Sequence, residues 1–580
     1  MKKFVLLSLV GLSILAFGTA GYAQQLYELE KGKPGSPHPN FQAGSYSQAV
    51  VGEKPPVLEF RASGFIDVIY EHNKNVVQAA PNPWTDFTGP LFGVNRLFAP
   101  QAGQGTITSG ALQGTPRGAA WNTQQSYFET RARLRFDAAM GKQVSGTIFF
   151  EMDATRWGER NGLGAQRNQA GNWNADSAAI ELKNAFISFA LPPIIPVPVT
   201  MNAGILPLVT RPVVQYTDGT GMNITFKPDP AQITFIWMKA LENQDWASDD
   251  ADVWGVQAKV NVGTVTVGGF LSYYNMNTYP FQSSGALSMY GVTSAFGGNS
   301  AYNSNFRNNN TADMSWWGLY ADGKLGPVYI NTDFVYDYGY VVAHGDTAFT
   351  NNRLSERKVD YRGWITRIAV DFPWEKFNFG VSGLYATGPD LRQTSATGLP
   401  GTAVGTGLAS DGFTRKVSGY IVPPNAEHVY DDEDYVIYGT GANGINRAGT
   451  GYNPSSGTGV GSGSYGGTWF AKLYGQYKPA PWYRITVFGM YIGDTAKHGN
   501  KLGDAVNSDG TPRDDKAIGW EIGLFNDIQI YRNLQLRAGG GYLFAGKAFD
   551  YHDLRTGAPA NTNASPANPW ALAVKLLYVF

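Results

Sequence analysis

The last eleven residues carry the feature that most restricts how this chain can fold. Counting back from the carboxyl terminus in steps of two gives one wholly apolar face, formed by Leu572, Val574, Leu576, Tyr578 and Phe580. Lys575 and two small alanines occupy the opposite face. Strict alternation with a period of two predicts a β-strand. A soluble domain seldom ends on such a strand, because the apolar face needs a covering layer and the open edge invites aggregation.

A closed β-barrel in a membrane removes both difficulties, because lipid covers the apolar face and the first strand pairs with the last. A strand that ends in Phe580, with aromatic or aliphatic residues at alternate positions before it, resembles the terminal strands of bacterial outer-membrane β-barrels. The resemblance implies that Phe580, Tyr578 and Leu576 form a signal read by the barrel assembly machinery. The alternative is the terminal strand of a soluble β-sandwich.

The amino terminus predicts export. Two lysines follow Met1, an apolar run extends from Phe4 to Phe17, and a small-x-small site ends at Ala23. This is the pattern of a cleaved secretory signal, and the apolar run is too short to span a bilayer. We therefore assign residues 1–23 to a signal peptide. Residues 24–56 are polar, contain several prolines and show no periodicity, which predicts a flexible periplasmic lead segment.

Composition excludes several classes of protein. The chain has no cysteine, which rules out a lipoprotein anchor, disulfides, thiolate metal sites and covalently attached haem. Its 45 basic and 46 acidic residues give no overall charge that would favour nucleic acid. Aromatic residues make up 14% of the chain, yet no apolar run after the signal approaches the ~20 residues of a membrane helix. Aromatics and glycines in short alternating segments favour barrel strands.

Residues 57–580 are predicted to form an all-β, transmembrane, antiparallel up-and-down barrel. The first strand, over residues 57–71, has an apolar face that includes Leu58 and Phe60. Its other face carries Glu59, Arg61, Asp67 and Glu71. An apolar exterior and a polar interior are the pattern of a barrel with a wet lumen.

The rest of the chain divides into hairpins with short turns and long polar loops, which gives eighteen strands in all. Their ranges are 57–71, 126–140, 144–154, 178–190, 199–207, 221–226, 231–242, 252–262, 264–277, 312–325, 328–340, 359–373, 377–388, 467–478, 482–494, 517–531, 534–546 and 570–580. An even count puts both ends of the barrel domain on the periplasmic side and the long loops on the extracellular rim. Sixteen strands is the alternative, because residues 199–226 contain Pro207 and Pro212.

The second predicted strand, over residues 126–140, carries the most distinctive row of charged residues. Its polar face carries three arginines between two acids, namely Glu129, Arg131, Arg133, Arg135 and Asp137. Arginines at repeats of about 6.6 Å cannot face lipid, where each costs on the order of 2–4 kcal/mol near the midplane. They are therefore predicted to line the lumen.

Two interpretations of these arginines are open. In the first, they form a ladder that passes an anionic or carboxylate-bearing solute along the pore. In the second, they pair with inward carboxylates of the first and third strands in a wall network that stiffens the barrel. Those carboxylates are Glu59, Asp67, Glu151 and Asp153.

The long insertions are predicted to narrow the pore. Residues 84–98 are too apolar for a loop in solvent, so they are expected to fold inward or to form a contact between protomers, with Arg96 as the candidate constriction residue. Inward charges of both signs on other strands suit a water-filled channel better than a fatty-acid transporter. No catalytic or metal-ligating pattern stands in a suitable context, so no enzyme activity and no cofactor are expected.

The chain resembles outer-membrane porins, and short phrases such as residues 318–327, 384–388 and 518–522 are similar to alginate-export-like and substrate-channel families. This resemblance implies passive diffusion of small hydrophilic solutes, and the row of arginines suggests a preference for anionic or carboxylated ones. The expected partners are outer-membrane lipid and lipopolysaccharide and the assembly machinery, with no nucleic acid; a homotrimer and a monomer are both open. The alternatives are a structural or adhesive barrel with a blocked lumen, and a barrel sheath around an electron-transfer partner.

Overall fold

Long alternating segments pair along the whole chain in the computed structural model. The structure describes residues 58–74, 124–141, 143–157, 180–192, 196–211, 214, 216–241, 250–277, 310–343, 357–388, 390, 394–395, 403–404, 416–423, 438, 467–500, 505–552, 562–565 and 567–580. The predicted signal peptide, the lead segment, and residues 84–98 with Arg96 lie outside these ranges.

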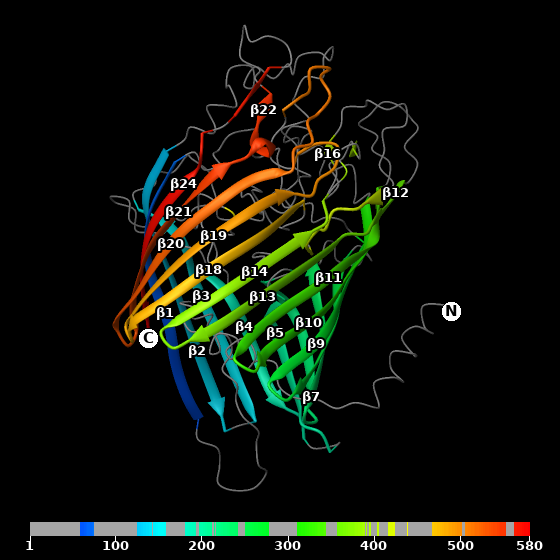
Figure 1. The fold of residues 1–580 in the computed structure, drawn as a ribbon. Helices are drawn as coiled ribbons and strands as arrows, with labels where there is room; N and C mark the ends of the chain where they lie inside the picture. The colour runs from blue at the N-terminus through cyan, green and yellow to red at the C-terminus, as the bar shows by residue number, and fades with distance from the viewer. Residues whose placement is uncertain are drawn as a thin grey trace.

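Eighteen long strands form one closed ring in which each strand pairs antiparallel with its two neighbours (Figure 1). Their bounds are β1 (Leu58–Lys74), β2 (Gln124–Met140), β3 (Val144–Arg156), β4 (Glu181–Ala190), β5 (Val199–Val209), β6 (Tyr216–Phe226), β7 (Ala231–Leu241), β8 (Ala251–Val262), β9 (Val265–Met276), β10 (Asn310–Leu325), β11 (Val328–Ala343), β13 (Trp364–Trp374), β14 (Phe377–Ala386), β18 (Thr468–Ala480), β19 (Tyr483–Asp494), β20 (Ala517–Tyr531), β21 (Leu534–Ala545) and β24 (Trp570–Val579). The predicted barrel of eighteen strands is confirmed.

Short elements lie between the long strands at the end of the barrel with the longer connections. Two of them, β12 (Arg357–Tyr361) and β17 (Lys416–Val417), pair in parallel and join the main sheet. The others are β15 (Thr394–Ser395), β16 (Ala403–Val404), β22 (Tyr551–His552), β23 (Asn563–Ala564) and the 3-10 helix η3 (Lys547–Phe549). The part of the chain that the structure describes contains no helix long and apolar enough to cross a bilayer.

The hairpin of β5 and β6 shows why sixteen strands is the wrong count. β5 pairs with β6 over its whole length, with Pro207 opposite Asp218. On its other side, pairing with β4 ends at Ile205. Pro207 therefore lies beyond the β4 ladder, where a residue without a main-chain N–H removes no bond on that side.

Short turns gather at one end of the barrel, where the carboxyl terminus also lies (Figure 1). Residues 263–264 join β8 to β9, and residues 326–327 join β10 to β11. Gly263 and Gly326 have φ values of 62° and 61°, in the left-handed region that glycine adopts without strain.

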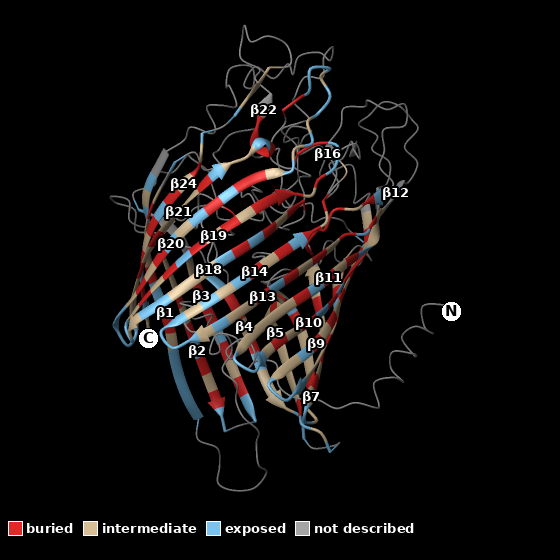
Figure 2. Cartoon of the chain, in the orientation of Figure 1, coloured by how far each residue is buried: buried red, intermediate tan, exposed pale blue. Residues whose placement is uncertain are grey.

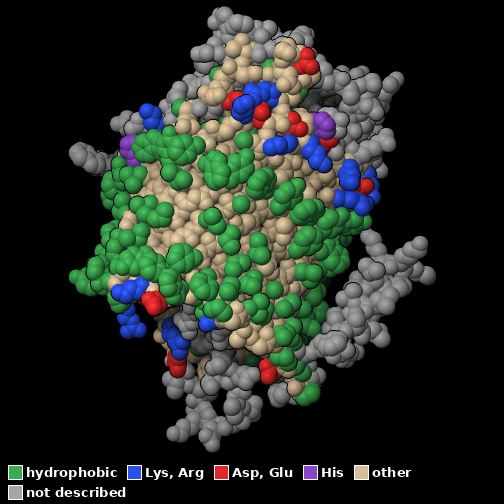
Figure 3. All heavy atoms as spheres, viewed as in Figure 1, with side chains coloured by type: hydrophobic (Ala, Val, Ile, Leu, Met, Phe, Trp, Pro, Cys, Tyr) green, Lys and Arg blue, Asp and Glu red, His purple; other side chains and the backbone are tan. Residues whose placement is uncertain are grey.

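Burial alternates along the strands, and the exposed positions on the flank of the barrel are apolar (Figures 2 and 3). On β24, Leu572 and Leu576 are exposed, whereas Ala573 and Lys575 are buried. Other strands contribute exposed apolar side chains such as Leu319 and Leu473. An apolar belt on the outer face of a closed barrel is the surface that a lipid bilayer covers.

Phe580 completes the closure of the barrel just beyond the end of β24. Its main-chain N–H donates to the Gly64 carbonyl at 3.0 Å, and the Gly64 N–H donates to the Phe580 carbonyl at 2.8 Å. The Phe580 ring packs against Gly64, since a Cβ at residue 64 would lie 2.8 Å from Phe580 Cζ. The same Cβ would lie 2.3 Å from the Arg133 carbonyl oxygen.

Replacing Gly64 by alanine is therefore expected to lower the free energy of unfolding by about 1–3 kcal/mol, because the strand and the terminal ring must move apart. The fraction of folded barrel, seen as the heat-modifiable band on a semi-native gel, measures the effect. Gly146→Ala on β3 is the matched control, because a Cβ at Gly146 meets nothing within 4 Å. Equal folding of the two variants would contradict the packing of Phe580 on Gly64.

Candidate functional site

The arginines of β2 lie on the inner face of the barrel, and each contacts a carboxylate. Arg133 Nε donates to Glu151 Oε1 on β3 at 2.8 Å, and Arg131 Nε lies 3.3 Å from the same oxygen. Lys183 on β4 approaches the other oxygen of Glu151 at 3.0 Å and Asp218 on β6 at 2.9 Å. One carboxylate thus serves three cations, so its single charge compensates each of them only in part.

Arg135 belongs to a separate contact within β2. Its Nε and Nη2 donate to the two carboxylate oxygens of Asp137 at 2.8 Å and 2.7 Å. The Thr147 hydroxyl donates to Asp137 at 2.6 Å. This bidentate geometry fixes the guanidinium against the wall and occupies both oxygens of its partner.

The remaining predicted site residues lie at different heights of the same wall. Asp67 is fully buried on β1, and its carboxylate lies 3.4 Å from Lys575 Nζ on β24. Glu59 and Arg61 pair at 2.9 Å at the end with short turns, where both side chains are exposed. Glu129 is buried on β2. The side chain of Asp153 lies outside the described part of the chain.

A further charged group lies between β19, β20 and β21. Arg484 donates to Asp527 through Nε at 3.0 Å, and Arg537 Nε approaches the other Asp527 oxygen at 3.4 Å. The Arg537 guanidinium lies over the Phe525 ring, 4.5 Å from its centroid. The inner wall next to β24 is therefore lined by paired charges, as it is next to β2.

The structure also shows two inward contacts from connections between strands, which the sequence did not indicate. The first is made by the β5–β6 connection, whose Arg211 reaches the inner faces of β10 and β11. Its Nη1 contacts Asp322 at 2.7 Å, its Nε contacts Asp333 at 2.5 Å, and its guanidinium lies over the Tyr320 ring. Gln257 on β8 donates to the Val209 carbonyl at 3.3 Å. The connection is thus held against the wall several strands away from β5.

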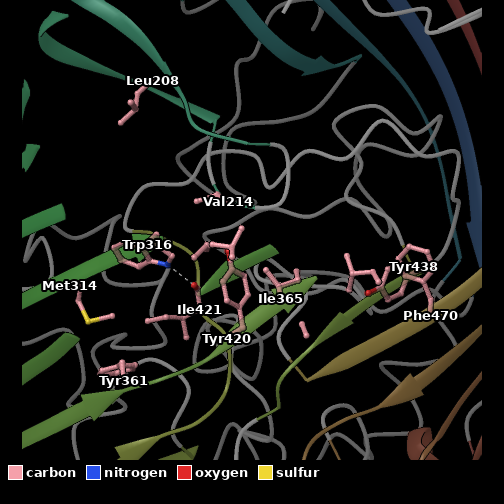
Figure 4. Close-up of a cluster of buried hydrophobic side chains, with 14 of the residues drawn as sticks. Leu208, Val214, Met314, Trp316, Tyr361, Ile365, Tyr420, Ile421, Tyr438 and Phe470 are labelled. Carbon is pink, nitrogen blue, oxygen red and sulfur yellow. Dashed lines mark hydrogen bonds between the residues drawn. The ribbon is translucent and has the colours of Figure 1, made fainter. Parts of the chain in front are cut away.

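The second contact is made by residues 416–423, which we call the inner segment. It belongs to the long insertion between β14 and β18. Trp316 Nε1 donates to the Ile421 carbonyl at 2.8 Å (Figure 4). The Ile421 N–H donates to Asp337 Oδ2 at 2.9 Å. The Tyr420 N–H donates to the Thr387 carbonyl at 2.9 Å. The inner segment therefore lies along the inner faces of β10 and β11.

The same insertion touches the wall again at Tyr438. Its N–H donates to Glu521 on β20 at 2.8 Å, and its hydroxyl lies 2.7 Å from that of Thr468 on β18. Tyr438 also packs edge-on against Phe470, with ring centroids 5.2 Å apart.

An apolar cluster joins these inward contacts inside the barrel (Figure 4). Trp316, Tyr361 and Tyr420 are completely buried in it, and Val214 of the β5–β6 connection belongs to it as well. Burial raises the pKa of the Tyr420 phenol well above its ordinary value, so this hydroxyl stays neutral. The mixed inward charges of the sequence suggested a polar lumen. The structure differs in one sector of the wall, which apolar groups cover.

Comparisons with known proteins give structural likeness at very low identity. No family model and no curated protein matches the sequence, so the alginate-export-like family is not shown. Among solved structures, the chain is similar to Pseudomonas aeruginosa OccK8 (OprE), with 8% identity, a TM-score of 0.42, and coverage of 90% of this chain and 98% of that one. OccK2 (OpdF) in complex with glucuronate, from the same organism, gives 6% identity, a TM-score of 0.41 and the same coverage.

Proposed function

We propose that this protein is an outer-membrane channel for the passive diffusion of small hydrophilic solutes. The observation that carries the proposal is the reversal of polarity across one closed sheet. Exposed apolar side chains lie on the outer face of most strands, while Arg133, Glu151 and Asp67 are buried on the inner side. Charged side chains in a lumen are retained where water and solutes pass, since a filled soluble core would favour apolar residues.

The proposed pathway runs along the charged wall of β1 to β4 and β24, which carries the contacts of Glu151, Lys183 and Asp67. Export through the signal peptide over residues 1–23 and insertion through the terminal strand signal belong to the same proposal. Lipopolysaccharide, the assembly machinery and a homotrimer are its expected partners.

We further propose that the channel favours anionic or carboxylated solutes. The gathering of Arg131, Arg133 and Lys183 around Glu151 supports this preference, because a carboxylate-bearing solute is attracted to a group of cations on the lumen wall. Arg131 is the most accessible of the three, with 14% of its side chain exposed.

Reversal potentials in a planar bilayer test this preference. Replacing Arg131 by glutamine is expected to shift the reversal potential of a salt gradient towards cations, because the group around Glu151 loses the most accessible of its three positive charges. Arg135→Gln is the matched control, since Arg135 is already held by both oxygens of Asp137. Equal shifts for the two variants, or no shift for either, would remove the anion preference.

The apolar cluster favours one alternative, a structural barrel whose lumen is blocked. Trp316 and Tyr420 lie completely buried inside the ring of strands. The wild-type barrel in a planar bilayer separates the two functions, because a channel gives stepwise ionic current and a blocked barrel gives none.

A further inference from the structure

Two inner-wall carboxylates accept hydrogen bonds from main-chain N–H groups of the same insertion. Asp337 on β11 accepts from the Ile421 N–H of the insertion at 2.9 Å. It also accepts at 2.6 Å from the N–H of Gly363, which directly precedes β13. Glu521 on β20 accepts from Tyr438 at 2.8 Å. Both carboxylates have no exposed surface. The insertion is thus attached at two places on the wall, in strands that are not adjacent in the ring.

The environment of Asp337 makes it dependent on these amides. Among the described residues, the titratable side chains that interact electrostatically with Asp337 are the phenols of Tyr361 on β12 and Tyr420 on the inner segment. A buried carboxyl group in this environment depends on the main-chain N–H groups of Ile421 and Gly363 for stabilisation.

The remaining main-chain attachments of the inner segment are neutral hydrogen bonds. β17 pairs with β12 over two residues, and the Arg362 N–H donates to the Val417 carbonyl at 2.9 Å. The Trp316 indole N–H donates to the carbonyl oxygen of Ile421. Ile421 is therefore held from both sides, by the Trp316 indole donor and by the Asp337 acceptor.

We propose that Asp337 is a positioning residue that fixes the inner segment against β11 and thereby sets the width of the solute pathway, with Glu521 holding Tyr438 in the same way. This inference rests on the proposed channel function. Without the Asp337 carboxylate, the inner segment moves away from the wall and its apolar face becomes accessible from the lumen.

A thiol probe tests the position of the inner segment independently of ion flow. Because the chain has no cysteine, Val422→Cys introduces a single thiol, at a residue that is 9% exposed. Adding Asp337→Asn is expected to speed its reaction with a charged methanethiosulfonate by about tenfold or more, because the amide has one acceptor oxygen where the carboxyl group uses two, so one buried N–H group loses its partner. Single-channel recordings of Asp337→Asn are expected to show a larger or more variable conductance.

Asp313→Asn is the matched control, because Asp313 on β10 accepts from Tyr273, Asn275 and Tyr340 but lies between buried Ala312 and Met314, on the opposite face of the strand. It is expected to leave thiol labelling unchanged. If Asp337→Asn does not fold, Ile421→Pro removes the donor and leaves the carboxylate in place, and it is expected to accelerate labelling as well.

The two readouts separate the two proposals. Unchanged labelling in a folded Asp337→Asn or Ile421→Pro variant would overturn the role of Asp337, whatever the current. Faster labelling, with no current through the wild-type or the variant protein, would support the role of Asp337 in placing the segment and would overturn the channel function.

Discussion

Replacing Arg211 by methionine is expected to lower the free energy of unfolding by about 3–5 kcal/mol, the cost of breaking a buried ion pair from one side. Arg211 is buried between Asp322 and Asp333, which are 8% and 2% exposed. Without the guanidinium, both carboxylates remain in the wall with less compensation. Urea unfolding in lipid vesicles, followed by tryptophan fluorescence, measures the loss.

Two further variants sharpen this test. Arg61→Met is the control, because Arg61 pairs with Glu59 at 2.9 Å while 62% of its side chain is exposed, and such pairs contribute about 0–1 kcal/mol. Adding Asp322→Asn to the Arg211 variant is expected to recover part of the loss, since one uncompensated charge is removed. A similar, small loss in the Arg211 and Arg61 variants would show that Arg211 does not hold the β5–β6 connection to the wall.

Replacing Leu473 by arginine is the second large expected effect, at about 2–4 kcal/mol of unfolding free energy for a charge near the middle of the bilayer. Leu473 lies in the middle of β18 and is 69% exposed on the outer face. On a surface in water, the same change would be nearly neutral. Urea unfolding of the barrel in lipid vesicles gives the difference.

Tyr531→Arg is the control for Leu473→Arg. Tyr531 is equally exposed, at 69%, but ends β20 beside the turn at 532–533, where a charge costs about 0–1 kcal/mol. If both variants unfold like the wild type, water and not lipid covers the apolar belt.

The barrel itself could be predicted because its signal is local. Leu572, Leu576 and Tyr578 alternate with Ala573 and Lys575, and this pattern alone assigns the two faces of the strand. Glycines and prolines mark the turns, so most strand boundaries follow within a few residues. The β5–β6 hairpin was harder, because Pro207 argues against a strand unless the extent of the neighbouring ladder is known.

The inward contacts could not be predicted because they join residues that are distant in sequence and lie outside any periodic pattern. Nothing near Arg211 indicates that it meets Asp322 and Asp333. The sequence predicted only some of the partners of the β2 arginines. Glu151 was named as one, whereas Asp137 holds Arg135 from the same strand and Lys183 arrives from β4. Strand alternation determines on which face of the sheet a side chain lies, but not which neighbouring side chain it contacts.

Pairing of β1 with β24 has a consequence for the order of events during biogenesis. The two strands lie at opposite ends of the barrel sequence, so the ladder between Phe65 and Val579 cannot form until the last strand has been synthesised and exported. Contacts of such high sequence separation are slow to form and leave strand edges open in the meantime. The strand that is synthesised last is therefore the one that closes the barrel, and the outer edge of β1 has no partner until β24 arrives.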